Sequence, residues 1–165
     1  MNNNDILRRL RFALDIPDVK VVKIFELGGR TLTIEEVKNI LKKEHEDGYL
    51  GCNNHMLKDF LNGFIIYRRG PLEVKPGATP QPEEEFQNKK NSNNNNLILK
   101  KLRIALEYKS DDMLKVFKLG GVELSESELS ALFRKKDHKN YKECGDKFIR
   151  VFLKGLVTLY RGDEL

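Results

Sequence analysis

The chain contains an internal repeat, and this duplication constrains its fold more than any other feature of the sequence. Ile6 to Gly70 align without a gap on Ile98 to Gly162, and about one aligned position in three is identical. The matching stretches include ILRRLRFAL with ILKKLRIAL, KIFELGG with KVFKLGG, and FLNG with FLKG. The chain is therefore expected to fold as two copies of one structural unit.

Each copy has the pattern of four amphipathic helices. In the first helix, expected from about Asn3 to Asp15, apolar residues recur three or four positions apart and charged residues lie between them. The same pattern returns from Ile98 to Leu106. The predicted fold class is all-α, with two homologous four-helix units at residues 1–70 and 97–165.

The third helix of each unit carries the clearest start signal. Thr33 and Glu36 form a T-x-x-E capping box, and Ser125 and Glu128 repeat it in the second unit. These glutamates are interpreted as helix caps rather than catalytic acids. Ser110 is expected to be the N-cap of the second unit's second helix.

Glycines at matching positions indicate helix ends and close helix contacts. Gly28-Gly29 and Gly120-Gly121 are expected to end the second helix of each unit. Gly63 and Gly155 lie inside the apolar fourth helix, where glycine costs about 1 kcal/mol relative to alanine. Close approach of another helix would compensate, so a bulky replacement of Gly63 should destabilise the protein by about 1–3 kcal/mol.

Pro, Gly, Glu and Asn dominate residues 71–96, between the two units. Because this composition offers little apolar surface to bury, the segment is predicted to be a disordered, flexible linker, and its NSNNNN run a simple spacer. Each unit is itself small, and a domain of about 60 residues buries only about 60% of the surface that its unfolded chain exposes. We therefore expect the units to pack on each other or to dimerise.

The composition excludes several classes of protein. No segment approaches the roughly 20 consecutive apolar residues that a membrane-spanning helix needs. Two cysteines are too few for a disulfide scaffold, and Met1 to Asp5 lack the apolar run of a secretory signal. We expect a cytoplasmic protein without membrane association.

The sequence lacks the motifs of common catalytic and cofactor sites. The Gly-Gly pairs have neither the spacing nor the G-K-[ST] ending of a phosphate-binding loop, and no G-x-S-x-G motif occurs. Cys52 and His55, with His45 upstream, are residue types that bind zinc. Lys147 and Asp137 replace the two histidines in the second unit, so the ligand set does not survive duplication. We expect no enzyme activity, metal, cofactor or small-molecule substrate.

Two cysteines and two tyrosines occupy matching positions just before the fourth helices. Cys52 and Cys144 are interpreted as small buried hydrophobic residues rather than a disulfide or redox pair. Tyr49 and Tyr141 are predicted to be core residues whose hydroxyls reach the surface.

Basic residues are the remaining candidates for a site. The chain has 30 basic and 25 acidic residues, and the resulting net charge of +5 favours an anionic partner only mildly because the signs are interspersed. A surface that tracks nucleic-acid phosphates, used once per unit, would comprise cations at the first helices and at the ends of the fourth. These are Arg8, Arg9, Arg11, Arg68, Arg69, Lys100, Lys101, Arg103 and Arg161. The alternative is an ordinary solvated helix face.

The helices around Gly28-Gly29 also have the proportions of a helix-turn-helix motif. Glu35 and Glu36 open the helix that would read bases, and their carboxylates would face phosphates unfavourably. The sequence therefore disfavours reading of the major groove.

The repeated pattern LRRLRFAL, LGG, a capping box, GYLGCNNHML and FLNGFIIYRRG resembles the YehS-like family of bacterial proteins, a domain of unknown function that occurs in tandem. The resemblance covers nearly the whole chain apart from the linker. It implies an intracellular bacterial protein of two helical units, with no activity, ligand or catalytic residue to transfer. The second unit departs from the first at Asn140 and at Lys142-Glu143, so a site in this turn need not be equivalent in both copies.

Together these features favour a non-enzymatic binding or interaction module. Its partner would be another protein or a second copy of the chain, held through one or both units, and the duplication suggests bivalent binding. The alternative is a nucleic-acid-binding protein that uses the basic first helices.

Overall fold

The computed structural model describes residues 1–70, 86–87 and 93–162, and this part of the chain folds into eight helices without strands. The first unit holds α1 (Asn3–Leu14), α2 (Asp18–Leu27), α3 (Ile34–Ile40) and α4 (Asn54–Arg69). The second holds α5 (Asn95–Leu106), α6 (Ser110–Leu119), α7 (Glu126–Leu132) and α8 (Asp146–Arg161). The all-α fold class and the two duplicated units are confirmed.

The predicted helix starts are confirmed where capping chemistry is strongest. The Thr33 hydroxyl accepts the Glu36 N–H at 3.1 Å, and the Glu36 carboxylate accepts the Thr33 N–H at 3.0 Å. Ser125 and Glu128 repeat this capping box. Ser110 differs from the prediction, because it is the first residue of α6 and Lys109 holds the N-cap position.

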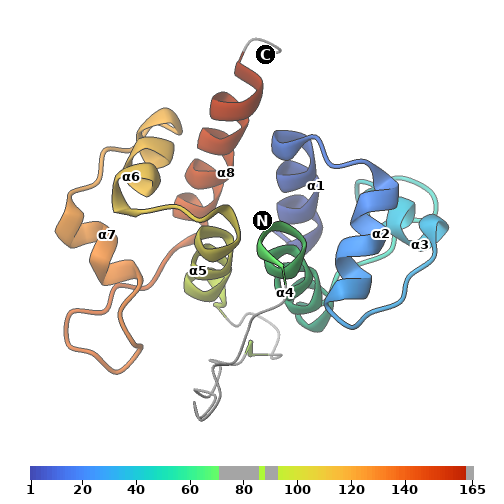
Figure 1. Cartoon of the computed structure of the whole chain (residues 1–165), viewed down its shortest axis with the longest axis horizontal. Coiled ribbons are helices and arrows are strands. Elements are labelled where there is room, and N and C mark those ends of the chain that lie inside the picture. The colour runs from blue at the N-terminus through green and yellow to red at the C-terminus, as the bar shows by residue number, and fades with distance from the viewer. Residues whose placement is uncertain (71–85, 88–92, 163–165) are drawn as a thin grey trace.

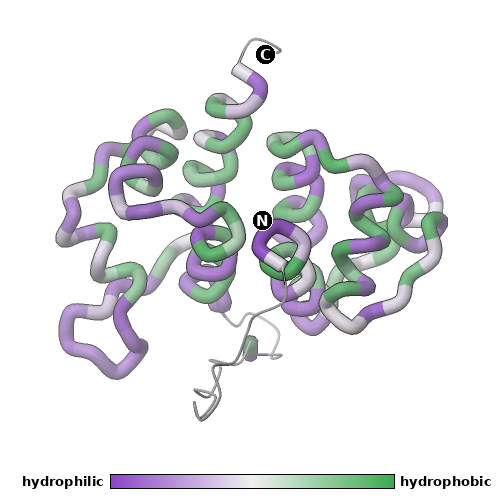
Figure 2. Tube along the Cα trace, in the orientation of Figure 1, coloured by the Kyte–Doolittle hydropathy of each residue, from purple (hydrophilic) through white to green (hydrophobic). Residues whose placement is uncertain are grey.

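The first helix of each unit packs chiefly against the fourth helix of the other unit. α1 lies along α8 and α4 along α5, so these four helices form the centre of the molecule (Figure 1). α2 and α3 cover one side and α6 and α7 the other. Apolar residues occur along all four central helices (Figure 2), and the buried residues of both units form one continuous core. The expected packing of the units on each other is thus present within one chain.

Arginines at the ends of α4 and α8 join the two units. Arg161 donates to the Phe12 carbonyl at 3.0 Å and lies 3.4 Å from the Asp15 carboxylate. Arg69, its equivalent in the first unit, pairs with Glu107 at 3.2 Å. Asp15 and Glu107 end their helices in the left-handed conformation, with φ of 53° and 57°. The repeated contact shows that an approximate twofold axis relates the units.

Backbone meets backbone where α2 crosses α4 and where α6 crosses α8. A Cβ atom on Gly63 would lie 1.8 Å from the Ile24 carbonyl oxygen, and one on Gly28 would lie 1.8 Å from the Asp59 carbonyl oxygen. The equivalent glycines of the second unit are as close to the opposite helix, at 1.9 and 2.0 Å. Only a hydrogen atom fits at these positions. The close approach predicted for Gly63 is confirmed.

The two glycines of each Gly-Gly pair have different roles. Gly29 and Gly121 have φ of 94° and 104°, the left-handed region expected at a helix end. Gly28 and Gly120 keep negative φ and instead permit the helix crossing.

The prediction of a disordered linker at 71–96 needs correction at its end. Residues 71–85 and 88–92 lie outside the described part of the chain. Phe86, however, belongs to the core and is only 5% exposed. The Asn94 side chain accepts the Gln87 N–H and donates to its carbonyl, and α5 begins at Asn95. The asparagines at residues 93–96 therefore belong to the start of the second unit rather than to a spacer.

Replacing Gly63 with alanine should lower the free energy of unfolding by about 1–3 kcal/mol, because the new methyl group forces α4 away from α2. Alanine's higher helix propensity works in the opposite direction by about 1 kcal/mol. Thermal or urea denaturation of the full chain measures the change. Gly51→Ala is the control, since nothing lies within 4 Å of its Cβ position. Equal stabilities of the two variants would contradict the crossing account.

Candidate binding surfaces

Three of the nine predicted anion-binding cations hold loops of their own unit. Arg8 donates to the Lys42 carbonyl at 2.9 Å and also contacts the Asp5 carboxylate. Arg11 donates to the Ile16 carbonyl at 3.0 Å. Arg103 makes the equivalent bond to the Tyr108 carbonyl at 3.1 Å and lies over the ring of Phe133 at the end of α7. These guanidinium groups therefore serve the fold.

Four further cations lie where the two units meet. Arg69 and Arg161 form the contacts between the units described above. Arg68 donates from Nε to the Ala105 carbonyl at 3.1 Å, and Lys101 donates to the Asn62 side chain at 2.6 Å. Each bond connects a helix of one unit to a helix of the other. These four residues stabilise the association of the units.

Arg9 and Lys100 are exposed on α1 and α5. The structure therefore divides the nine predicted residues among loop contacts, unit contacts and exposed positions. It does not gather them into one separate patch. The prediction that they bind anions stays a prediction.

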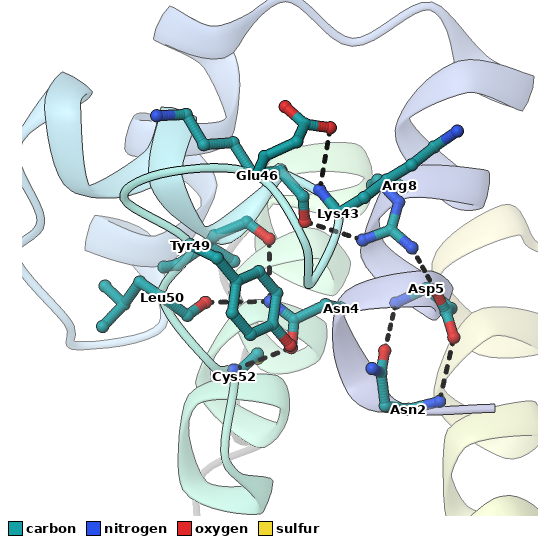
Figure 3. Close-up of polar contacts among 11 residues, drawn as sticks. Asn2, Asn4, Asp5, Arg8, Lys43, Glu46, Tyr49, Leu50 and Cys52 are labelled. Atoms are coloured by element: carbon teal, nitrogen blue, oxygen red, sulfur yellow. Dashed lines mark hydrogen bonds and ion pairs between the residues drawn. The ribbon is translucent and has the colours of Figure 1, made fainter.

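An asparagine in each unit, buried in the first and partly buried in the second, organises the loop before the fourth helix, and the sequence interpretation missed it. Asn4, 2% exposed, donates to the carbonyls of Ile40 and Leu50 at 2.8 and 2.9 Å (Figure 3). Its Oδ1 accepts the Tyr49 hydroxyl and the Cys52 N–H, each at 2.9 Å. One side chain thus satisfies four polar groups and joins α1 to the end of α3 and to the loop before α4.

The second unit repeats this asparagine clamp. Asn96 donates to the carbonyls of Leu132 and Lys142 and accepts from Tyr141 and the Cys144 N–H, at 2.8–3.0 Å. The sequence signal was present, because the identity between the copies extends upstream to Asn2–Asn4 and Asn94–Asn96. Because these asparagines were assigned to the spacer, the prediction did not include the clamp.

The tyrosine prediction is corrected by this geometry. The hydroxyls of Tyr49 and Tyr141 turn inward to the asparagines, while the side chains remain partly exposed. Burial, with the Glu44 charge as a smaller cause, raises the pKa of Tyr49.

Both cysteines are free and buried, as the sequence predicted. Burial raises the pKa of the Cys52 thiol from 9.0 to about 12, and that of Cys144 likewise to about 12. Neutral buried thiols are poor nucleophiles. Among the described residues, no group of three or more His, Cys, Asp or Glu side chains could hold a metal ion.

The loops after α3 and α7 are equivalent in backbone and opposite in charge. Residues 134–154 carry eight basic and three acidic residues, a net charge of +5, whereas the equivalent residues 42–62 carry three basic and four acidic. The loop after α7 is mainly hydrophilic (Figure 2). The net charge of this one segment, +5, equals the net charge of the whole chain.

The cations of this segment form what we call the basic face: Arg134, Lys135, Lys136, Lys139, Lys142, Lys147, Arg150 and Lys154. All eight are exposed. Within the described part of the chain, none of them forms an ion pair with a carboxylate. Positions 147, 150 and 154 follow the helical spacing that places side chains on one side of α8.

Two contacts at the start of α8 position the basic face, one with the preceding loop and one with the start of α1. The Lys142 amine lies 5.0 Å from the centre of the Phe148 ring, which brings the loop against the first turn of α8. The Met1 amino group lies 3.8 Å from Asp146, so α1 and α8 start together and run parallel.

No helix within the described residues is long and apolar enough to cross a membrane.

Comparisons with known proteins agree with the duplication. A family model described as a protein of unknown function (DUF1456) matches residues 3–70 and again residues 95–162. The Escherichia coli K12 protein named "Uncharacterized protein YehS" is 40% identical over 158 residues, which are 96% of each chain. No solved structure matches the chain.

Replacing Asn4 with leucine should cost about 2–4 kcal/mol of unfolding free energy, because buried donors and acceptors lose their partner while the volume is kept. Chemical denaturation measures the change. Asn62→Leu is the control, since Asn62 is only partly buried and its bond reaches an interface lysine. If both variants lost the same small amount of stability, the asparagine would not organise the loop.

Both thiols should resist modification in the folded protein. A pKa raised from 9.0 to about 12 lowers the thiolate fraction at pH 8 about a thousandfold, and the raised value means that the thiols stay protonated as the pH rises past 9. Reaction with a chromogenic disulfide reagent, with and without urea, measures this difference. Rapid labelling of the folded chain would show that the cysteines are accessible.

Proposed function

The chain belongs to the YehS-like family of unknown function (DUF1456), and we propose that it is a non-enzymatic protein that binds nucleic acid through the basic face of its second unit. The observation that carries this proposal is the charge difference between two equivalent loops. The segment that carries the basic face, residues 134–154, has a net charge of +5, whereas the equivalent residues 42–62 have one more acidic residue than basic.

The form of the basic face suits a polyanion. Its cations are exposed and lack carboxylate partners among the described residues, so binding a phosphate would break no existing ion pair. The loop combines Arg134 and lysines with the α8 stripe Lys147, Arg150 and Lys154 over an extended area. Repeated phosphates match repeated cations, and each contact releases counterions from the nucleic acid.

The location of this surface differs from the one considered in the sequence. Seven of the nine predicted cations hold loops or connect the two units. Six of these seven donate to a backbone carbonyl or form an ion pair, as Arg8, Arg68 and Arg161 do. Using them for phosphates would compete with contacts that hold the fold. The basic face has no such second role.

The non-enzymatic part of the proposal rests on the groups whose pKa values are perturbed. They are two buried thiols, the tyrosines Tyr49 and Tyr108, and the capping residue Glu128. Hydrogen bonds from the Ser125 backbone and hydroxyl lower the pKa of Glu128, which is the ordinary effect of a capping box. These groups are distributed over both units, whereas catalysis needs them to converge on one substrate.

Binding of the full chain to short fluorescent DNA and RNA of mixed sequence, followed by anisotropy over a range of salt concentrations, tests the proposal. The variant K135A/K136A/K139A should bind at least tenfold more weakly near physiological salt. Its slope of log affinity against log salt should fall by up to about 2.7, because each phosphate contact contributes about 0.9.

The control variant K20A/K23A/K38A removes the same number of exposed lysines from the first unit. It should bind nearly as well as the unmodified chain. An equal loss in both variants would mean that net charge alone drives binding. Absence of binding at about 50 mM salt, where phosphate contacts are strong, would rule out the proposal.

A further inference from the structure

The corner where α1 turns into α2 contains a small pocket. It has a volume of about 160 Å³ and is lined by the turn at residues 14–17 and by Phe64, Tyr67 and Arg68 of α4. Leu14, Ile16, Pro17 and the two aromatic residues supply apolar groups, and polar groups, including Asp15 and Arg68, make up at least half of the exposed lining. The basic face belongs to the other unit, so this pocket is a separate feature.

The second unit has the same corner with a different filling. Tyr108 replaces Ile16 and Tyr160 replaces Arg68, and the two tyrosine hydroxyls are hydrogen-bonded to each other. Burial of the phenol, with this hydrogen bond as a second cause, raises the pKa of Tyr108. A tyrosine ring therefore occupies the corner that lies open in the first unit.

The backbone of the two corners is held in the same way. Arg11 donates to the Ile16 carbonyl at 3.0 Å, and Arg103 donates to the Tyr108 carbonyl at 3.1 Å. The residue before each is left-handed, with φ of 53° at Asp15 and 57° in its counterpart. The difference in filling thus comes from the side chains rather than from the course of the chain.

The size and chemistry of the open corner match one phenol ring. A cavity of about 150 Å³ lined by Leu, Ile and Phe holds a benzene molecule in another protein, and the pocket here has about 160 Å³. Phe64 and Tyr67 offer ring contacts. Arg68 occupies the position equivalent to Tyr160, whose hydroxyl is hydrogen-bonded to that of Tyr108 in the second unit. A guanidinium group has five N–H donors, and the one on Nε of Arg68 donates to the Ala105 carbonyl.

We propose that this pocket is a docking site for a tyrosine side chain presented by a partner protein. The ring enters between the α1–α2 turn and α4, as the ring of Tyr108 does in the second unit. Its hydroxyl accepts a hydrogen bond from Arg68. The chain thereby holds a protein partner on its first unit, on a surface separate from the basic face.

The probe for this site is p-cresol, which has the ring and hydroxyl of a tyrosine side chain. Its addition to isotope-labelled full chain should cause saturable NMR shifts at Ile16, Phe64 and Tyr67, with a dissociation constant in the millimolar range. Toluene, which lacks the hydroxyl, should bind several-fold more weakly. Shifts caused by adenosine but not by p-cresol would overturn the proposal in favour of a base-binding pocket.

Two variants follow from the comparison of the corners. Ile16→Tyr fills the pocket as Tyr108 does and should abolish the shifts, while Ile34→Tyr, the same substitution at an exposed position of α3, should leave them unchanged. Unsaturable shifts, or shifts that persist in folded Ile16→Tyr, would overturn the proposal. If that variant does not fold, equal binding of toluene and p-cresol to the unmodified chain would overturn it.

Discussion

Burial of the first helix of each unit against the other unit is the constraint on which the rest of the structure depends. A unit of this size cannot cover all its apolar surface, and α1 and α5 carry apolar stripes that their own units cover only in part. Packing of α1 on α8 and of α5 on α4 covers both apolar stripes. The two contacts are equivalent because an approximate twofold axis relates the units. The result is a single core rather than two adjacent ones.

This exchange explains the placement of the polar contacts. The helices that meet across the units run parallel, so the ends of α4 and α8 reach the ends of α5 and α1. Arg69 and Arg161 there meet an acidic residue that closes the partner helix. Surface ion pairs of this kind contribute modestly to stability. The two equivalent ion pairs instead reflect the approximate twofold symmetry. The buried apolar surface stabilises that arrangement.

The two units agree in their helix crossings and asparagine clamps and differ in two loops and in the corners after their first helices. The crossing glycines and the asparagine clamps are present in both, because loss of either leaves a steric clash or unsatisfied polar groups. The loops after α3 and α7 and the corners at Ile16 and Tyr108 have diverged in charge and filling. Both proposals rest on these differences, because residues that differ between the units are not required for the shared fold and can instead contact a partner.

The sequence by itself determined the helices, their capping boxes and the close approach at Gly63, because these depend on local spacing and on comparison of the two copies. It did not reveal that the clamp asparagine Asn4 joins three segments, that the Tyr49 hydroxyl turns inward, or that Arg161 holds the other unit. Those outcomes depend on which surfaces meet across long separations in the chain. Only the tertiary structure decided them, because a polar side chain has the same local signal whether its partner is water or a distant carbonyl.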